Sequence, residues 1–178
     1  RVLRGAVEVG EGERERAEEM AKRGGAPIFN PDEKRLQVRV GEEDPLVKRV
    51  VKAMEEEGLV QGRTVGPAVV LHSLEGCERQ PLHTDYDVRA VGRSAAKPLG
   101  VLVALQDGTR LGMPEGEEGV ELRKGDVAVF DGDQPHAGEA YDKPNTRMHL
   151  YLDCPGVHRV PNETYPSLET HQNELLEG

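Results

Sequence analysis

The feature that most constrains this chain is a change in its hydrophobic period near residue 63. Beyond that point, apolar residues form short or alternating runs separated by turn-forming clusters, which is typical of β-strands. The runs are TVGPAVVLHSL, PLGVLVAL, VELR, DVAVFD, HAGEAY and RMHLYLD. Three clusters have the composition of hairpin turns: 106–109, 123–126 and 142–145. The chain has no Trp and only two Phe, so its core must consist mainly of Val, Leu and Ala, and Val-rich cores favour strands.

Two helices are predicted ahead of the strands. Residues 13–23 pair charges at i,i+4 spacing, and residues 44–58 carry an apolar stripe with Asp44 as N-cap, Pro45 in the first turn and Gly58 at the end. Helices followed by strands predict a β-rich α+β fold, a jelly roll with helices packed on one face. We expect a single domain over 1–178, divided into helical support at 1–62, a β-barrel core at 63–153 and a C-terminal tail at 154–178.

The net charge and the cysteine content indicate which classes of partner and which cellular location are expected. The chain carries 33 Asp and Glu against 23 Lys and Arg, and this net charge of −10 disfavours nucleic acid as a partner because it repels polyanions. No stretch approaches the roughly 18 apolar residues that a membrane-spanning helix needs, so no membrane partner is expected. Cys77 and Cys154 are too few for a disulfide framework, which favours an intracellular location, cytoplasmic or nuclear.

The segment QPLHTDYD contains the first candidate site residues. Residues two apart on an extended segment point to the same face, so His83 and Asp85 can approach one metal ion together. A third ligand is expected from a distant strand, and His136 follows the run DVAVFD and a turn, where an imidazole would reach the mouth of a barrel. Asp87 is the alternative carboxylate if the segment bends, but the phase of Asp85 relative to His83 favours Asp85.

With Arg147 added, these residues resemble the Fe(II)- and 2-oxoglutarate-dependent dioxygenases, a family with a double-stranded β-helix fold that is related to the cupin barrel. The resemblance covers about residues 63–153 and depends on the order of the His-x-Asp triplet, the distant His and the Arg. It implies that His83, Asp85 and His136 hold Fe(II) as the catalytic centre. It also implies that 2-oxoglutarate and O₂ are consumed, that a substrate is hydroxylated or oxidatively demodified, and that succinate and CO₂ are released.

The resemblance further implies that Arg147 binds the distal carboxylate of 2-oxoglutarate, which a planar guanidinium can hold by two parallel hydrogen bonds. His149 and Tyr151 alternate in phase with Arg147, so they are expected to face the same interior and are further candidates for binding the cosubstrate.

Three alternatives stay open. The run GDVAVFDGDQPHAG also resembles half of a cupin motif, which would make the chain a metal-binding protein without oxygenase activity. The second alternative is a purely structural or interaction β-sandwich, in which the three candidate ligands come together by accident. A protein side chain or a small molecule is the expected substrate, but a nucleic-acid base is not excluded, because Arg89, Arg93 and Lys97 form a basic stretch. These three lie in the segment 88–97, which we expect to be a mobile loop that determines specificity.

Overall fold

The computed structural model describes residues 1–27, 33–160 and 163–167. Its elements are β1 (Val2–Leu3), α1 (Glu13–Gly24), β2 (Ala26–Pro27), β3 (Arg35–Val40), α2 (Pro45–Glu56), β4 (Thr64–Ser73), β5 (His83–Thr84), α3 (Val88–Val91), β6 (Leu99–Ala104), β7 (Thr109–Gly112), β8 (Val120–Leu122), β9 (Val127–Asp131), β10 (Ala137–Gly138), β11 (Asn145–Asp153) and β12 (Tyr165–Pro166). Within these ranges, no helix has the length and apolar character that would let it cross a membrane.

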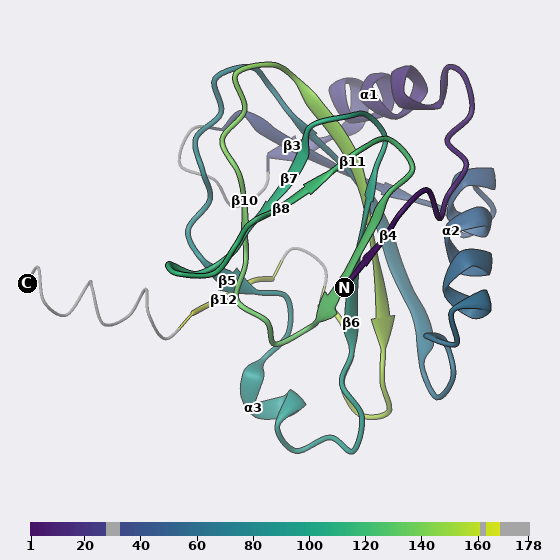
Figure 1. The fold of residues 1–178 in the computed structure, drawn as a ribbon, viewed down its shortest axis with the longest axis vertical. Helices are drawn as coiled ribbons and strands as arrows, with labels where there is room; N and C mark the ends of the chain where they lie inside the picture. The colour runs from purple at the N-terminus through teal and green to yellow at the C-terminus, as the bar shows by residue number, and fades with distance from the viewer. Residues whose placement is uncertain (28–32, 161–162, 168–178) are drawn as a thin grey trace, which may run out of the picture.

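The strands form two layers, and helices cover only one of them (Figure 1). The larger layer is an antiparallel sheet in the order β1-β9-β6-β11-β4-β3-β2. On its other side lie two small sheets, β10-β7-β8 and β12-β5, which are joined by a bridge between His83 and His136. Both α1 and α2 lie against the face of the large sheet that points away from the small sheets. The predicted β-rich jelly-roll arrangement with helices on one face is therefore confirmed.

Helix α2 shows how local sequence and packing combine. The Asp44 carboxylate accepts a hydrogen bond from the backbone N–H of Leu46 at 2.9 Å, and Pro45 occupies the first turn, as predicted. The helix ends at Glu56, slightly before the predicted limit, and Gly58 follows with a φ of 69°. The buried face of the helix consists of Leu46, Val47, Val50, Ala53 and Met54. Burying a large apolar side chain contributes about 1.5–3 kcal/mol, so this face stabilises α2 more than its cap does.

Strand β11 connects the core of the protein to its interior cavity. It lies between β4 and β6 and is buried along its whole length. Successive side chains of a strand point to opposite faces. One face of β11 packs into the core beneath the helices: Met148, Leu150 and Leu152. The other face lines the cavity between the two layers: Arg147, His149 and Tyr151. The predicted alternation of polar and apolar residues is therefore present.

The N-terminal segment is more than the helical support that was predicted for it. Strand β3 pairs with β4 along its length and widens the large sheet, β2 pairs with β3, and β1 pairs with β9. The first and second strands have only two residues each, too few to show a period. Strand β3 has the alternating sequence RLQVRV. It was not predicted because it contains two charged residues and lies between the two predicted helices.

Two other segments also differ from expectation. The predicted loop at 88–97 contains α3, whose N-cap Asp87 accepts a hydrogen bond from the backbone of Arg89 at 2.8 Å. Its Val91 is buried, so this segment is partly anchored. The predicted tail contributes β12, which pairs with β5, and its residues 161–162 and 168–178 lie outside the described ranges.

Candidate metal centre and adjoining cavity

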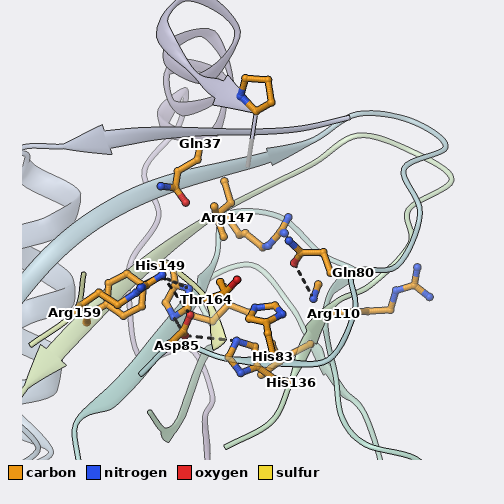
Figure 2. A pocket seen from close by; sticks show the side chains of 16 residues that line it. Gln37, Gln80, His83, Asp85, Arg110, His136, Arg147, His149, Arg159 and Thr164 are labelled. Carbon is orange, nitrogen blue, oxygen red and sulfur yellow. Dashed lines mark hydrogen bonds and ion pairs between the residues drawn. The ribbon is translucent and has the colours of Figure 1, made fainter. Parts of the chain in front are cut away.

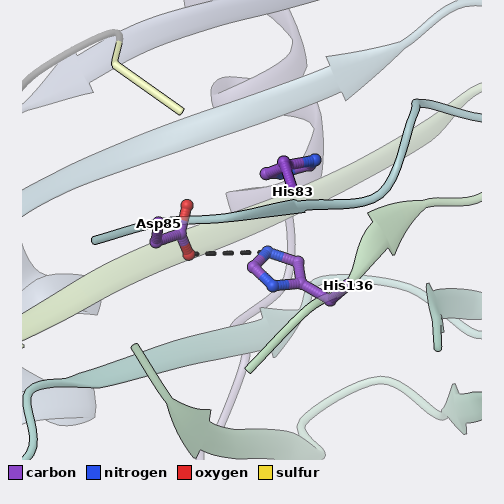
Figure 3. A group of neighbouring side chains, drawn as sticks. All are labelled: His83, Asp85 and His136. Atoms are coloured by element: carbon purple, nitrogen blue, oxygen red, sulfur yellow. Dashed lines mark ion pairs between the residues drawn. The ribbon is translucent and has the colours of Figure 1, made fainter. Parts of the chain in front are cut away.

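The two candidate histidine ligands lie directly opposite each other on neighbouring strands. The backbone N–H of His83 donates to the carbonyl of His136 at 3.0 Å, and the N–H of His136 donates back to the carbonyl of His83 at 2.9 Å. Residues paired in this way in an antiparallel bridge point to the same side of the sheet. The two ring centroids are therefore only 4.7 Å apart, and Figure 3 shows both rings beside Asp85.

Asp85 completes the group, as the two-residue spacing predicts. Its Oδ2 lies 3.5 Å from Nε2 of His136. One ligand atom from each of His83, Asp85 and His136 lies within 4.8 Å of the others, and all three residues are buried. The structure thus brings together the three residues that the sequence singled out. Asp87, the alternative carboxylate, instead caps α3.

The hydrogen bonds of the group fit a metal ion. Nδ1 of His83 lies 2.9 Å from the carbonyl oxygen of Pro81, and Nδ1 of His136 lies 2.9 Å from that of Gln134. A carbonyl can only accept, so each Nδ1 carries the proton and each Nε2 keeps a lone pair for a metal. Oδ2 of Asp85 is buried and has no hydrogen-bond partner among the described residues, which a bound cation would supply.

The protonation states also suit a metal. Burial, assisted by His136, lowers the pKa of His83 from 6.5 to about 4, and burial lowers the pKa of His149 to about 3 against the opposing effect of Asp85. For Asp85 itself, burial acts to raise the pKa, but His136, His149 and Arg159 together outweigh it and the pKa is lowered. Metal binds to neutral imidazole and to ionised carboxylate, and these are the forms that the lowered pKa values favour for His83 and Asp85 at neutral pH.

A cavity of about 220 Å³ extends from this group between the two layers (Figure 2). Arg147 lines it, is buried, and donates a hydrogen bond to Oγ of Ser73 at 3.0 Å. Ser73 is also held by the buried Arg35 of β3 at 2.9 Å. Among the described residues no Asp or Glu forms an ion pair with Arg147, so its charge faces the cavity without an acidic partner.

His149 and Tyr151 line the same cavity, but on the side of Asp85. Nε2 of His149 lies 3.5 Å from Oδ2 of Asp85, and the Tyr151 hydroxyl lies 3.3 Å from Nδ1 of His149. A hydroxyl that donates to Nδ1 would leave the proton of the imidazole on Nε2, directed at the carboxylate. His149 therefore lies against Asp85, although its Nε2 has no hydrogen-bond partner among the described residues.

Two residues at the site were not predicted from the sequence. Arg159, from the segment taken as a tail, has a side chain only 5% exposed; its Nη2 lies 3.8 Å from Oδ1 of Asp85 and its guanidinium lies 4.9 Å from the Tyr151 ring centroid. Phe130 packs its ring 4.6 Å from that of His136. An isolated Arg in a polar segment and a Phe near a strand end carry no signal that separates them from surface or core residues.

Other residues near the motif have structural partners. The buried Tyr86 hydroxyl donates to Asp153 at 2.8 Å, and Gln80 accepts a hydrogen bond from the backbone of Gly138 at 3.1 Å while lining the cavity. His72 is buried beside Thr146 and does not belong to the group of residues that could hold a metal.

No family model matches the sequence, and no curated protein matches it. Solved structures do share the fold. A viral collagen prolyl hydroxylase from Paramecium bursaria Chlorella virus-1, in complex with 2-oxoglutarate, is 14% identical with a TM-score of 0.64 over 85% of this chain and 94% of its own. The non-heme α-ketoglutarate-dependent epimerase SnoN from nogalamycin biosynthesis is 13% identical, with a TM-score of 0.66 over 90% and 78%. HygX from Streptomyces hygroscopicus, with nickel and 2-oxoglutarate bound, is 13% identical, with a TM-score of 0.63 over 86% and 82%.

Identities this low establish the fold and leave activity and substrate to be argued from the site. The chain has the β-rich jelly-roll fold of the iron- and 2-oxoglutarate-dependent oxygenases, and inside that fold it brings a His–Asp–His triad together.

Proposed function

We propose that this chain is an Fe(II)- and 2-oxoglutarate-dependent oxygenase. The observation that carries the proposal is that one cavity contains both the His–Asp–His triad and a buried arginine without an acidic partner among the described residues. Two imidazoles and one carboxylate on one side of a metal are typical of non-haem iron oxygenases. Similar folds have been solved with 2-oxoglutarate and with a metal bound, which supports the same cosubstrate here.

In this proposal His83, Asp85 and His136 hold the iron through the two Nε2 atoms and the carboxylate. When bound, iron with 2-oxoglutarate supplies O₂ activation, coupled to the release of succinate and CO₂. The backbone carbonyls that accept from Nδ1 fix the tautomers of both histidines, and the ring of Phe130 excludes water beside His136.

Arg147 is proposed to hold the distal carboxylate of 2-oxoglutarate. Its guanidinium is oriented by Ser73, which is itself fixed by Arg35, so the cation is held in place before the ligand arrives. His149 and Tyr151 are proposed to border the bound cosubstrate while keeping Asp85 in position.

The proposed substrate is a protein side chain or a small molecule, which is hydroxylated or oxidatively demodified. The solved structures with this fold include a collagen prolyl hydroxylase and an epimerase from nogalamycin biosynthesis, so both substrate classes are compatible with the fold. The net charge of −10 disfavours nucleic acid, and an intracellular location stays a prediction.

Metal and cosubstrate binding test the proposal separately. We expect Asp85→Asn and His136→Ala to lose most of the Mn(II) that the parent binds in calorimetry, whereas Asp87→Asn should bind Mn(II) like the parent because Asp87 caps α3. Arg147→Gln should bind metal normally but bind 2-oxoglutarate roughly 30- to 150-fold more weakly, because a charged hydrogen-bonded partner contributes about 2–3 kcal/mol. Arg147→Lys should retain part of the affinity.

The outcomes separate the rival functions. An oxygenase releases succinate from 2-oxoglutarate in the presence of Fe(II) and O₂; a cupin-type metal-binding protein binds metal but forms no succinate, and a structural β-sandwich does neither. Normal metal binding by Asp85→Asn would contradict the triad, and unchanged 2-oxoglutarate affinity in Arg147→Gln would contradict the cosubstrate site.

A further inference from the structure

A second cavity, of about 280 Å³, adjoins the metal cavity. The two have three lining residues in common, Gln37, Tyr151 and Arg159, so the second cavity begins where the first one ends. The remaining lining residues are three apolar or small side chains and one cation: Ala26, Pro67, Val69 and Arg39. A mostly apolar hollow with a few convergent charged groups is the usual form of a small-molecule subsite.

The two cations of the second cavity, Arg39 and Arg159, both have hydrogen-bond donors that no described residue accepts. Arg39 is exposed, and it has no ion pair or side-chain hydrogen bond among the described residues. Arg159 has a buried guanidinium that contacts the Val160 carbonyl, Asp85 at 3.8 Å and both the ring and the hydroxyl of Tyr151, and its Nε has no hydrogen-bond partner in the described part of the chain. A guanidinium has five N–H donors, and the one on Nε of Arg159 is buried without an acceptor.

The charge balance of the two cavities is opposite to that of the whole chain. The described residues lining them include four arginines: Arg39, Arg110, Arg147 and Arg159. Asp85 is the sole carboxylate among those lining residues. The chain has a net charge of −10, yet cations predominate at this place. Two of them, Arg147 and Arg159, are buried, and a buried cation with too few anionic partners is unfavourable until an anion binds.

The cations lie at different ends of the site. Figure 2 shows Arg159 next to His149 and Asp85, whereas Arg147 lies toward Gln80 and Arg110. On β3, Gln37 and Arg39 share one face, and Arg39 pairs in register with Val69 of β4, so these residues form adjacent parts of the wall of the second cavity. One anion at Arg147 leaves Arg159 and Arg39 for a second one.

We propose that the second cavity binds the primary substrate, and that this substrate is a small molecule with an apolar body and a carboxylate or phosphate group held by Arg39 and Arg159. The proposal rests on the proposed function, because it takes Arg147 as the site of 2-oxoglutarate. The apolar body of the substrate would then lie along Val69 and Pro67.

The test is an NMR titration of the ¹⁵N-labelled protein loaded with Zn(II) and 2-oxoglutarate, using hexanoate, hexyl phosphate and hexanamide as probes. We expect hexanoate or hexyl phosphate to shift the amide signals of Gln37, Arg39 and Val69, and hexanamide to bind at least about tenfold more weakly, since a tenfold change corresponds to about 1.4 kcal/mol. Whichever of hexanoate and hexyl phosphate binds more tightly indicates whether the substrate carries a carboxylate or a phosphate.

Variants assign the binding to the cations. Arg39→Gln should weaken the anionic probes about tenfold and leave hexanamide unchanged, and Arg39→Lys should restore most of the affinity. Arg23→Gln, which removes an exposed charge from α1, is the matched control and should bind like the parent. Because Arg159 is buried, Arg159→Gln is informative only as a second variant, provided that its spectrum stays dispersed.

Equal affinity for hexanoate and hexanamide, unchanged affinity in Arg39→Gln, or no shift at Gln37, Arg39 and Val69 with any probe would overturn the proposal. Failure of the proposed function is recognised separately. In that case 2-oxoglutarate does not bind, or it binds Arg147→Gln as tightly as the parent. The same titration without 2-oxoglutarate still measures whether Arg39 binds the anionic probes.

Discussion

Acidification of the metal-free protein should destabilise it well above the pH at which carboxylates titrate. His83 and His149 are buried as neutral imidazoles, with pKa values lowered from 6.5 to about 4 and about 3. Below pH 6.5 these two histidines are protonated in the unfolded chain but stay neutral in the folded chain. The free energy of unfolding therefore decreases as the pH falls from 6.5 toward these lower values. Asp85 acts in a different window, because its lowered pKa preserves its contribution until the pH falls below about 3.8.

The magnitude follows from the size of the shifts. At pH 5 an unfolded histidine with a pKa of 6.5 has gained its proton, whereas neither buried imidazole has; the gap of about 1.5 pH units corresponds to roughly 2 kcal/mol for each residue. The groups that face His149 do not cancel this effect. Asp85 favours the protonated form, but His136, Arg159 and Arg147 oppose it, and burial dominates.

Urea unfolding followed by circular dichroism at pH 8, 6.5 and 5 measures the effect. We expect the free energy of unfolding of the metal-free protein to fall by about 4 kcal/mol between pH 8 and pH 5. His149→Asn should show about half of this pH dependence, and His158→Asn, whose side chain is 69% exposed, should show the parent's. A free energy of unfolding that is the same at pH 8 and pH 5 would refute the reasoning.

Two packing features give further predictions. Gly100→Ala would place a methyl group 2.5 Å from the Phe130 ring, so we expect a loss of about 1–3 kcal/mol in urea unfolding and weaker Mn(II) binding in calorimetry, whereas Gly41→Ala, which meets no atom within 4 Å, should match the parent in both. Asp44→Ala removes the cap of α2 and should lower the free energy of unfolding by about 1 kcal/mol without changing Mn(II) affinity; equal stability would show that the cap contributes nothing.

The parts of the site that could be read from the sequence are those set by local geometry. The two-residue spacing of His83 and Asp85 predicted that they converge, which they do although Asp85 lies just beyond the short strand β5. Arg147, His149 and Tyr151 share a face of β11 because the side chains of a strand alternate. The order of the triad and the arginine resembled a known family, which supplied the pairing of His136 with a distant segment. Asp44 and Pro45 similarly marked the start of α2.

Distances between segments far apart in the sequence were decided only by the tertiary structure. The sequence determined which side chains of one strand could point to the same side. Only the β-bridge between His83 and His136 in the folded protein brings His136 next to His83 and Asp85. Arg159 reaches Asp85 because the segment that contains it leads into β12, which pairs with β5. Neither the composition nor the hydrophobic period of that segment predicts this pairing. Local patterns reflect the geometry of one strand, whereas the second cavity depends on how separate strands pack together.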